Sequence, residues 1–353
     1  MTDPTPTRVF AGIDTHADTH HVALIDHDGR PLADQQFTTD PAGLDHLAQF
    51  LTRHGQPLRI GIEGTNSYGK PLTHLLHADG HTLVEVNRPD RHQRRQHGKS
   101  DPTDAYAAAH AVRTNRATTP PKLTTGAIEG LRLTKMTRAS AVHSRTQTIN
   151  EIRATLRTGP TELAHYNKLT LRAMITTLAK LRHNPTGDAT MNHTKAALTT
   201  LARRWQHLTD EITTADKTIT TIVNDIAPEL IAVDCVGPHT AAQLLITAGS
   251  NPDRLTTEAQ FARLTGVAPI PASSGKTRRH RLHRGGDRQA NNALWRIAFN
   301  RRQHHPATRA YYQRRQQHLT DREILRCLKR YIARELFPIL TMIINREHTK
   351  NAH

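Results

Sequence analysis

The chain has 353 residues and a formal net charge of +17, with 48 Lys and Arg residues against 31 Asp and Glu residues. Its two cysteines, Cys235 and Cys327, are too few for a cysteine-rich zinc site and too far apart to indicate a structural disulfide. No segment approaches the ~20 consecutive apolar residues of a membrane span, and the N-terminal residues lack the basic-then-apolar order of a signal peptide. We therefore expect a soluble, cytoplasmic protein without a membrane partner.

The charge is unevenly distributed along the chain. Residues 1–105 hold 10 basic and 14 acidic residues, whereas the remainder holds 38 basic and 17 acidic residues. A basic body joined to a mildly acidic domain suits a polyanionic partner, with the carboxylates kept for a local purpose. Membrane headgroups are also polyanionic, but no basic amphipathic anchor flanks an apolar segment. The favoured partner is nucleic acid.

The first part of the chain alternates between strand and helix patterns. Short apolar runs predict strands at residues 9–14, 21–26, 32–37, 58–63 and 82–86. Helical patterns cover residues 41–53, 69–77 and 101–111, and the last begins with Asp and Pro, which suit a first turn. Three successive strands followed by alternating helices and strands is the order of an RNase H-like fold. We predict an α/β domain of this type over residues 1–117.

The middle of the chain is predicted to be helical. The sequence Thr-Thr-Pro-Pro at residues 118–121 indicates a linker, and a helix is expected over residues 128–157. A second helix carries apolar side chains at alternating spacings of three and four: Leu198, Leu201, Trp205, Leu208, Ile212, Ala215, Ile219, Ile222 and Ile226. This pattern predicts a coiled coil, formed either as an intramolecular hairpin or as an intermolecular seam. We assign residues 122–228 to this region and residues 229–353 to a mainly α-helical C-terminal domain.

Four acidic residues stand at the ends of predicted elements. Asp14 and Glu63 close the first and fourth strands, which are neighbours in an RNase H-like sheet, and Asp101 and Asp104 share one helical face. Each has an ordinary explanation alone, as a turn cap, a surface residue or a helix cap. Together they form a cluster whose repulsion divalent cations would neutralise. Two ions ~3.5–4 Å apart can stabilise both oxygens of a phosphodiester exchange, so we predict two Mg²⁺ ions, replaceable by Mn²⁺.

The residues around these acids resemble a known family. Gly12-Ile-Asp14-Thr-His16, Glu63-Gly-Thr65 and Lys99-Ser-Asp101-Pro-Thr-Asp104-Ala105 are similar to the motifs of DEDD-type insertion-sequence transposases. Members of that family have a RuvC-like N-terminal domain and a separate C-terminal transposase domain. The resemblance covers nearly the whole chain, and it implies that Asp14, Glu63, Asp101 and Asp104 are catalytic metal ligands.

A serine in a basic segment is the second candidate for chemistry. Ser273-Ser274-Gly275 precedes a run of cations that is expected to bind phosphates with steep salt dependence: Lys276, Arg278, Arg279, Arg281, Arg284 and Arg288. Taken by itself, such a serine most often caps a helix or donates a hydrogen bond to phosphate.

The family resemblance changes this interpretation. Gly266-Val-Ala-Pro269 and Arg284-Gly-Gly-Asp287-Arg288 resemble a block of the family's C-terminal domain, in which a serine joins covalently to DNA. This implies that Ser274 is the nucleophile, with Ser273 as the alternative. A serine hydroxyl needs a base or a metal for activation. No His lies at an obvious catalytic spacing, so the simplest account is that the carboxylate-bound metals assist it.

Two further motifs have less specific interpretations. Residues 231–241 resemble a helix-hairpin-helix, which binds phosphate at a helix N-terminus, but Cys235 replaces the first glycine of its hairpin. Tyr311-Tyr312 is interpreted as packing or base stacking, because the Arg-His-Arg framework of a tyrosine recombinase is not recognisable around it.

The leading functional hypothesis is a transposase that cuts and rejoins DNA through a covalent serine intermediate. The resemblance further implies a structured non-coding guide RNA, and a homo-oligomer, dimer or tetramer, is expected. One alternative is a RuvC-like junction resolvase or structure-specific endonuclease, which would use water and leave no protein–DNA adduct. Another is a non-catalytic nucleic-acid-binding protein with a decayed metal site.

Overall fold

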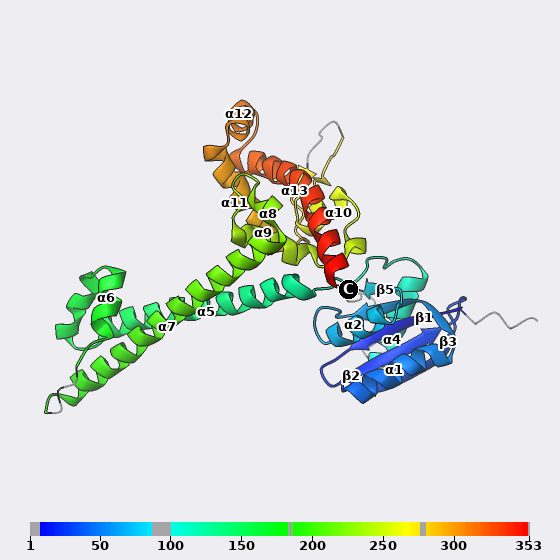
Figure 1. The fold of residues 1–353 in the computed structure, drawn as a ribbon, viewed down its shortest axis with the longest axis horizontal. Helices are drawn as coiled ribbons and strands as arrows, with labels where there is room; N and C mark the ends of the chain where they lie inside the picture. Colours follow the sequence, from blue (N-terminus) through cyan, green and yellow to red (C-terminus); the bar gives the residue numbers. More distant parts are fainter. Residues whose placement is uncertain (1–7, 87–99, 183, 185, 276–279, 352–353) are drawn as a thin grey trace, which may run out of the picture. The chain divides into compact units, whose positions relative to one another are not determined.

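The computed structural model describes residues 8–86, 100–182, 184, 186–275 and 280–351 (Figure 1). The chain divides into two compact units, which are described separately. The N-terminal unit comprises Met1–Thr124 and Ala248–Gln260, and the helical unit comprises Thr125–Thr247 and Phe261–Asn351. The division into domains at 1–117, 122–228 and 229–353 remains a prediction.

The N-terminal unit contains a five-stranded mixed sheet. Its strands are β1 (Arg8–Thr15), β2 (Thr19–Ile25), β3 (Pro31–Thr38), β4 (Gln56–Glu63) and β5 (Leu83–Val86). The spatial order is β3-β2-β1-β4-β5, in which β1, β2 and β3 pair antiparallel and β4 pairs parallel with both β1 and β5. This order agrees with an RNase H-like fold, and it confirms that the first and fourth strands are neighbours.

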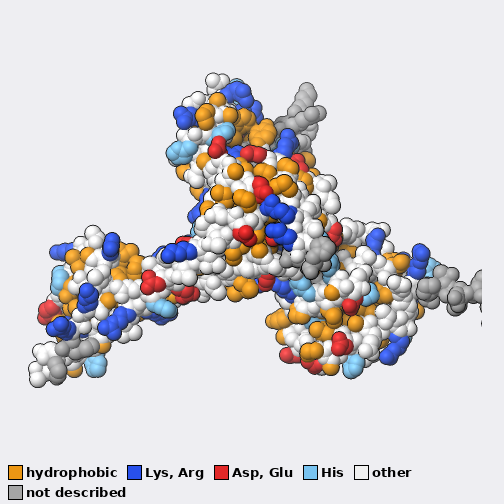
Figure 2. Space-filling view, in the orientation of Figure 1, with side chains coloured by type: hydrophobic (Ala, Val, Ile, Leu, Met, Phe, Trp, Pro, Cys, Tyr) orange, Lys and Arg blue, Asp and Glu red, His pale blue; other side chains and the backbone are white. Residues whose placement is uncertain are grey.

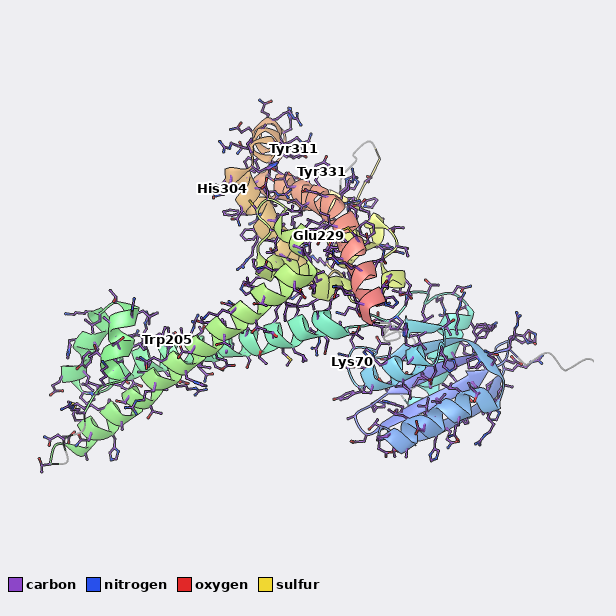
Figure 3. All side chains as sticks on the ribbon, viewed as in Figure 1. Lys70, Trp205, Glu229, His304, Tyr311 and Tyr331 are labelled. Atoms are coloured by element: carbon purple, nitrogen blue, oxygen red, sulfur yellow. The ribbon has the colours of Figure 1, made fainter. Side chains whose placement is uncertain are left out.

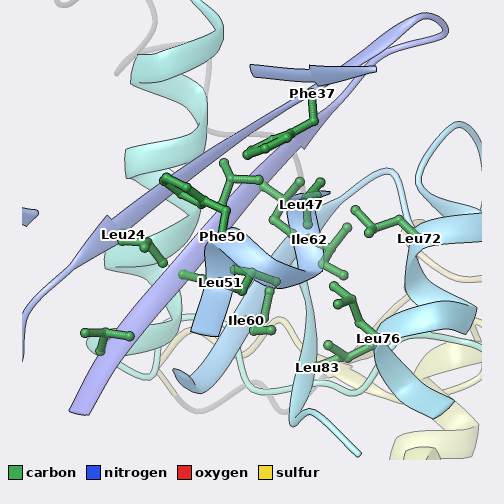
Figure 4. Close-up of a cluster of buried hydrophobic side chains, with 14 residues drawn as sticks. Leu24, Phe37, Leu47, Phe50, Leu51, Ile60, Ile62, Leu72, Leu76 and Leu83 are labelled. Carbon is green, nitrogen blue, oxygen red and sulfur yellow. The ribbon is translucent and has the colours of Figure 1, made fainter. Parts of the chain in front are cut away.

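One face of the sheet packs against α1 (Pro41–Arg53) and α2 (Lys70–Ala78). The Asp40 side chain accepts a hydrogen bond from the Gly43 N–H and so caps α1, with Pro41 in its first turn. Apolar side chains from the strands and from the two helices pack together between the sheet and the helices (Figure 4): Leu24, Phe37, Leu47, Phe50, Leu51, Ile60, Ile62, Leu72, Leu76 and Leu83. The apolar side chains that recur with the helical and strand periods therefore pack into one core.

The opposite face of the sheet packs against α4 (Asp101–Arg113) at very short range. Gly12 and Gly61 are register partners on β1 and β4. A Cβ atom on Gly12 would lie 2.0 Å from the Ala105 carbonyl oxygen, and one on Gly61 would lie 2.9 Å from that of Ala108. The two glycines thus allow the helix backbone to lie directly on the sheet, and no other residue type fits at Gly12 without moving it.

The segment Ala248–Gln260 packs with the N-terminal unit. The Asn251 Oδ1 atom accepts a hydrogen bond from the Leu123 N–H at 2.9 Å. The Arg254 guanidinium lies 3.3 Å from the carboxylate of Glu85 on β5, and both side chains are largely buried. These contacts connect residues far apart in the sequence, which explains why the chain pattern alone did not indicate them.

The helical unit begins with two long helices, α5 (Gly126–Thr158) and α7 (Ala189–Ile226). They pack against each other in antiparallel directions (Figure 1). Gly130 lies opposite Ile222, and farther along α5 the Arg145 guanidinium donates to the Thr209 hydroxyl at 3.5 Å. Within this chain the predicted apolar seam therefore pairs with α5, whereas the regular heptad geometry of a coiled coil remains a prediction.

The far end of this helix pair is closed by η1 (Thr161–Lys168) and α6 (Leu171–Leu178). Their apolar side chains bury the ends of α5 and α7 in one cluster: Ile152, Leu156, Leu163, Met174, Ile175, Leu178, Leu198 and Ala202. Among the nine seam positions, Leu201, Trp205 and Ile222 are only partly buried. Trp205 instead lies under the Arg145 guanidinium, 5.5 Å from the ring centroid.

The remainder of the chain is mainly helical. Its elements are α8 (Pro228–Ile231), α9 (Pro238–Ala248), η2 (Pro252–Arg254), α10 (Glu258–Leu264), β6 (Ile270–Pro271), β7 (His280–Arg281), α11 (Arg288–His304), α12 (Pro306–Arg315) and α13 (Asp321–Asn351). The sequence analysis did not predict β6 and β7, because two-residue strands are too short to show a period of two. No helix among the described residues is long and apolar enough to cross a membrane.

Ion pairs fix the C-terminal helices. Arg301 on α11 is buried, and its guanidinium makes two hydrogen bonds, of 2.6 and 2.9 Å, to the carboxylate of Glu335 on α13. Arg346 on α13 pairs with Glu229 on α8 at 2.5 Å. Bidentate pairs of this kind set the orientation of both partners, so α8, α11 and α13 form one scaffold.

Candidate metal centre and nucleic-acid segment

The sheet places two of the predicted carboxylates on the face covered by α4. Asp14 and Glu63 have the same strand parity as Gly12 and Gly61, whose Cβ positions point at α4. Ile13 and Ile62 are register partners, so Asp14 and Glu63 follow at adjacent strand ends. The Thr15 hydroxyl donates to the Glu63 carbonyl oxygen at 2.7 Å and ties these ends together.

The other two carboxylates come from the first turn of α4. Ser100 caps this helix, accepting a hydrogen bond from the Thr103 N–H at 3.4 Å. Asp101 is half exposed, whereas Asp104, one turn farther, is 5% exposed. The close contact between the backbones of α4 and β1 at Gly12 places the first turn of α4 beside the C-terminal end of β1.

A histidine that was not assigned a role from the sequence joins the cluster. The His16 Nε2 atom lies 3.1 Å from Asp14 Oδ2 and 3.3 Å from Asp101 Oδ1. Ligand atoms of these three residues all lie within 4.8 Å of one another, an arrangement that could hold a metal ion. The spacing of two between Asp14 and His16 at a strand end is the signal that would have indicated this neighbour.

The electrostatics show that the carboxylates repel one another. Burial raises the pKa of Asp14 above its ordinary value of 3.8, and the nearby carboxylates of Asp104 and Asp101 raise it further, against the lowering effect of His16. Asp104 is thus close enough to Asp14 to disfavour its ionisation. A bound cation would reverse this balance.

The donor set fits a divalent metal. Asp14 and Asp101 offer carboxylate oxygens, which Mg²⁺ prefers, and His16 offers a nitrogen, which suits Mn²⁺ better than Mg²⁺. Asp104 and Glu63 lie outside the group held within 4.8 Å, so the described geometry unites two of the four predicted carboxylates with His16. The assignment of all four acids as metal ligands remains a prediction.

The candidate serine lies in the helical unit, beyond β6 of a small hairpin. Ile270 pairs with Arg281 and Pro271 with His280, and Ser273 and Ser274 are exposed in the connection between the strands. Gly275 has a φ of +54°, a backbone conformation that favours glycine.

The predicted phosphate-binding cations are only partly described. Lys276, Arg278 and Arg279 lie outside the described residues. The side chains of Arg281, Arg284 and Arg288 are exposed, at β7, in the following loop and at the start of α11.

The residues around these cations have structural roles. Asp287 caps α11 by accepting hydrogen bonds from the N–H groups of Gln289 and Ala290 at 2.7 and 3.1 Å. A Cβ atom on Gly286 would lie 2.2 Å from the Gly266 nitrogen. Because neither residue has a side chain, the backbones at Gly266 and Gly286 can lie in direct contact.

Residues 231–241, which resemble a helix-hairpin-helix in sequence, contain a left-handed residue before α9. Cys235 has a φ of +64°, the left-handed conformation that glycine adopts at such a turn. Gly237 follows and precedes α9, and its N–H donates to the Thr240 hydroxyl at 3.0 Å. Cys235 thus adopts the backbone conformation that favours glycine, at the position where the resemblance implies one.

Comparison with known proteins identifies the family. A DEDD transposase family, of the IS110 type, matches residues 11–159, and the transposase family IS116/IS110/IS902 matches residues 227–313. The chain belongs to the IS110 family of transposases. In this IS110-family chain, the first match includes Asp14, Glu63, Asp101 and Asp104, and the second includes Ser274.

Two relatives from Streptomyces coelicolor are similar to parts of the chain. A protein named as a transposase for the mini-circle IS117 is 31% identical over 159 residues, which cover 42% of this chain. An uncharacterised 43.6 kDa protein of the insertion element IS110 is 41% identical over 91 residues, which cover 25% of this chain. These alignments span only 38% and 22% of the relatives' own lengths.

Proposed function

We propose that this chain is a DNA transposase that cuts and rejoins strands with a metal-assisted serine. The observation that carries the proposal is the cluster at the end of β1, where a buried carboxylate, a half-exposed carboxylate and an imidazole lie within 4.8 Å. A purely structural role gives no reason to gather like charges that raise the pKa of Asp14. Membership of the IS110 family supplies the reaction class.

In this proposal Asp14, Glu63, Asp101 and Asp104 would hold two divalent cations, which would polarise the phosphate and stabilise developing charge on its oxygens. The Ser274 hydroxyl adds to phosphorus and loses its proton, while the departing deoxyribose oxygen accepts one. The ester formed between Ser274 and the phosphate retains the free energy of the cleaved phosphodiester bond. Attack on this ester by the hydroxyl of another strand end therefore releases the serine and rejoins the DNA. Arg281, Arg284 and Arg288 hold the flanking phosphates.

The experiment that tests the serine is adduct mapping. Protein isolated with its native nucleic acid is incubated with Mg²⁺, or Mn²⁺, and DNA carrying the ends of its element, and then denatured and digested. We expect a DNA-linked peptide containing Ser274, and its absence in Ser274→Ala, with Ser273→Ala as the matched control. Cleavage without any adduct would instead support a resolvase that uses water, and no metal-dependent cleavage in any context would support a binding protein.

We also propose a guide RNA and a homo-oligomer as partners. The net charge of +17 supports a polyanionic ligand but does not distinguish RNA from DNA. Protein isolated with its native nucleic acid and treated separately with RNase and DNase tests the RNA. The proposal requires that RNase alone abolishes strand exchange at the element's ends. Light scattering of the RNase-treated and untreated protein reports the oligomeric state.

A further inference from the structure

The helical unit contains a large basic cavity that the proposed chemistry does not use. Its volume is about 910 Å³, at the upper end of the range for small-molecule sites. The walls come from the segment that follows α10, from β7, and from α12, α13 and the turn between them. Six cations line it: Arg281, Arg315, Arg326, Lys329, Arg330 and Arg334. Figure 2 shows Lys and Arg side chains gathered around α12 at the top of the view.

Among the described residues that line the cavity, the cations outnumber the acidic residues, of which Glu323 is one. Its carboxylate already accepts hydrogen bonds from the N–H and the hydroxyl of Thr320 at 2.9 and 2.7 Å, and it lies 3.8 Å from the Arg326 guanidinium. The excess of positive charge therefore calls for an anionic ligand.

Two side chains at the wall have unsatisfied donors or acceptors. The Arg315 Nε and His283 Nδ1 atoms are inaccessible to solvent and have no hydrogen-bond partner within the described residues. A buried polar group in this state is costly.

A lysine is held at the same wall by a rigid support. Lys329 is 7% exposed, and its Nζ atom donates to Asn291 Oδ1 at 2.8 Å. The Asn291 amide in turn donates to the carbonyl oxygens of Thr265 and Gly266 at 2.8 and 3.2 Å. Burial lowers the pKa of Lys329, and the Arg326 charge adds to this effect. A phosphate beside the ammonium would oppose this lowering of the Lys329 pKa.

An aromatic ring is also available at the cavity. Tyr331 lines it and is 51% exposed. The Tyr311 ring meets it edge-on with centroids 5.6 Å apart, where α12 lies beside α13 (Figure 3). Tyr311 thus fixes the orientation of the Tyr331 ring, and a base can stack on a fixed aromatic ring.

We propose that this cavity binds a nucleotide of single-stranded DNA, with its phosphate on Arg315 and Lys329 and its base against Tyr331. This assignment rests on the proposed function, in which Ser274 attacks the DNA strand. Strand β7 forms both a wall of the cavity and one strand of the hairpin that carries Ser274. Ser274 is three residues beyond Pro271, or about 10 Å of extended chain. A strand attacked at Ser274 would extend its neighbouring nucleotide into this subsite.

Binding of a fluorescent short oligothymidylate to the full-length protein tests the phosphate contacts. We expect Arg315→Gln to weaken binding about tenfold and to reduce the salt slope by about one. The matched control is Arg322→Gln, which removes the same charge from an exposed position on α13 outside the cavity, and should change affinity less than about twofold. Equal losses in both variants would overturn the subsite in favour of general electrostatic attraction.

A second pair of probes tests the base contact. Tyr331→Ala should weaken oligothymidylate about tenfold and leave an abasic oligonucleotide of the same length unchanged, whereas Tyr331→Phe should bind both normally. Equal effects of Tyr331→Ala on both probes, or tighter binding of oligouridylate than of oligothymidylate, would refute the assignment. Thermal unfolding of each variant shows whether the fold is intact.

The subsite and the chemistry can fail independently. Ser274→Ala should keep the Arg315-dependent binding of oligothymidylate while losing the DNA adduct. Binding without any cleavage by the unmodified protein would remove the proposed function and leave the subsite standing. Cleavage that is unaffected by Arg315→Gln and Tyr331→Ala, together with unchanged binding, would remove the subsite alone.

Discussion

The N-terminal and helical units position their reactive groups in different ways. In the N-terminal unit, Asp14 on β1 and Asp104 on α4 are each 5% exposed, and the backbone of α4 contacts the sheet at Gly12. In the helical unit, Ser274 is exposed between two-residue strands. Charges that must remain close despite repulsion require a rigid support, whereas a nucleophile that must reach along a DNA strand benefits from an accessible position.

The largest expected effect is loss of cleavage when a carboxylate of the cluster is neutralised. Because bound metals contribute several kcal/mol to transition-state stabilisation, Asp104→Asn should slow single-turnover cleavage by about 10³-fold or more. The matched control is Asp45→Asn, at an exposed position on α1, which should cleave normally. If Asp104→Asn retained full activity, the role of the N-terminal unit in catalysis would be lost.

Gly12→Ala should damage the same site through the backbone alone. The added Cβ atom would lie 2.0 Å from the Ala105 carbonyl oxygen, so α4 must move away from β1. We expect a loss of about 1–3 kcal/mol in the free energy of unfolding, measured with urea, together with impaired cleavage.

The comparison variant for this test is Gly130→Ala on α5, whose Cβ atom would meet only the Ile222 side chain, at 3.9 Å. It should gain up to about 1 kcal/mol, because alanine favours a helix over glycine. Similar behaviour of the two variants would mean that close packing does not position the carboxylates.

Divalent metal should stabilise the folded protein. A ligand at 100 times its dissociation constant adds about 2.7 kcal/mol to the free energy of unfolding. We expect such an increase with Mg²⁺ or Mn²⁺ in the unmodified protein and a much smaller one in Asp14→Asn, monitored by thermal unfolding. Equal stabilisation of both proteins would place the metal elsewhere.

The pH dependence of the metal-free protein provides a further test. Since the pKa of Asp14 is raised in the folded state, the folded protein binds this proton more tightly than the unfolded chain does. The resulting stability is fully present below the ordinary value of 3.8 and is lost as pH rises through the higher folded value. Asp14→Asn should therefore gain stability relative to the unmodified protein as pH increases, and a constant difference would contradict this account.

The smallest expected effect concerns the exposed cations of the helical unit. Arg281→Gln should weaken DNA binding several-fold, uniformly across sequences, and should reduce the salt slope by about one. The fold should not change, because the side chain is exposed. Discrimination between DNA sequences that depended on Arg281 would indicate base recognition rather than phosphate contact.

The sequence predicted the N-terminal fold well because buried strands and amphipathic helices leave strong periodic patterns. It predicted that β1 and β4 are neighbours, and therefore that Asp14 and Glu63 end adjacent strands, as the pairing of Ile13 with Ile62 confirms. His16 was missed as a neighbour of the carboxylates, although it stands in the motif. A histidine has many roles, and only its 3.1 and 3.3 Å contacts with Asp14 and Asp101 distinguish this one.

Local pattern and tertiary packing therefore contribute different information. Residue types and their spacing predicted the order of the strands along the chain and the long helices, because these depend on contacts between near neighbours. They also located the acidic residues and the run of basic residues. Only the tertiary structure decided that the α7 seam pairs with α5, that Ala248–Gln260 joins the N-terminal unit, and that cations distributed from Arg281 to Arg334 line one cavity. Such contacts join residues far apart in the chain, and no sequence period records which of them meet.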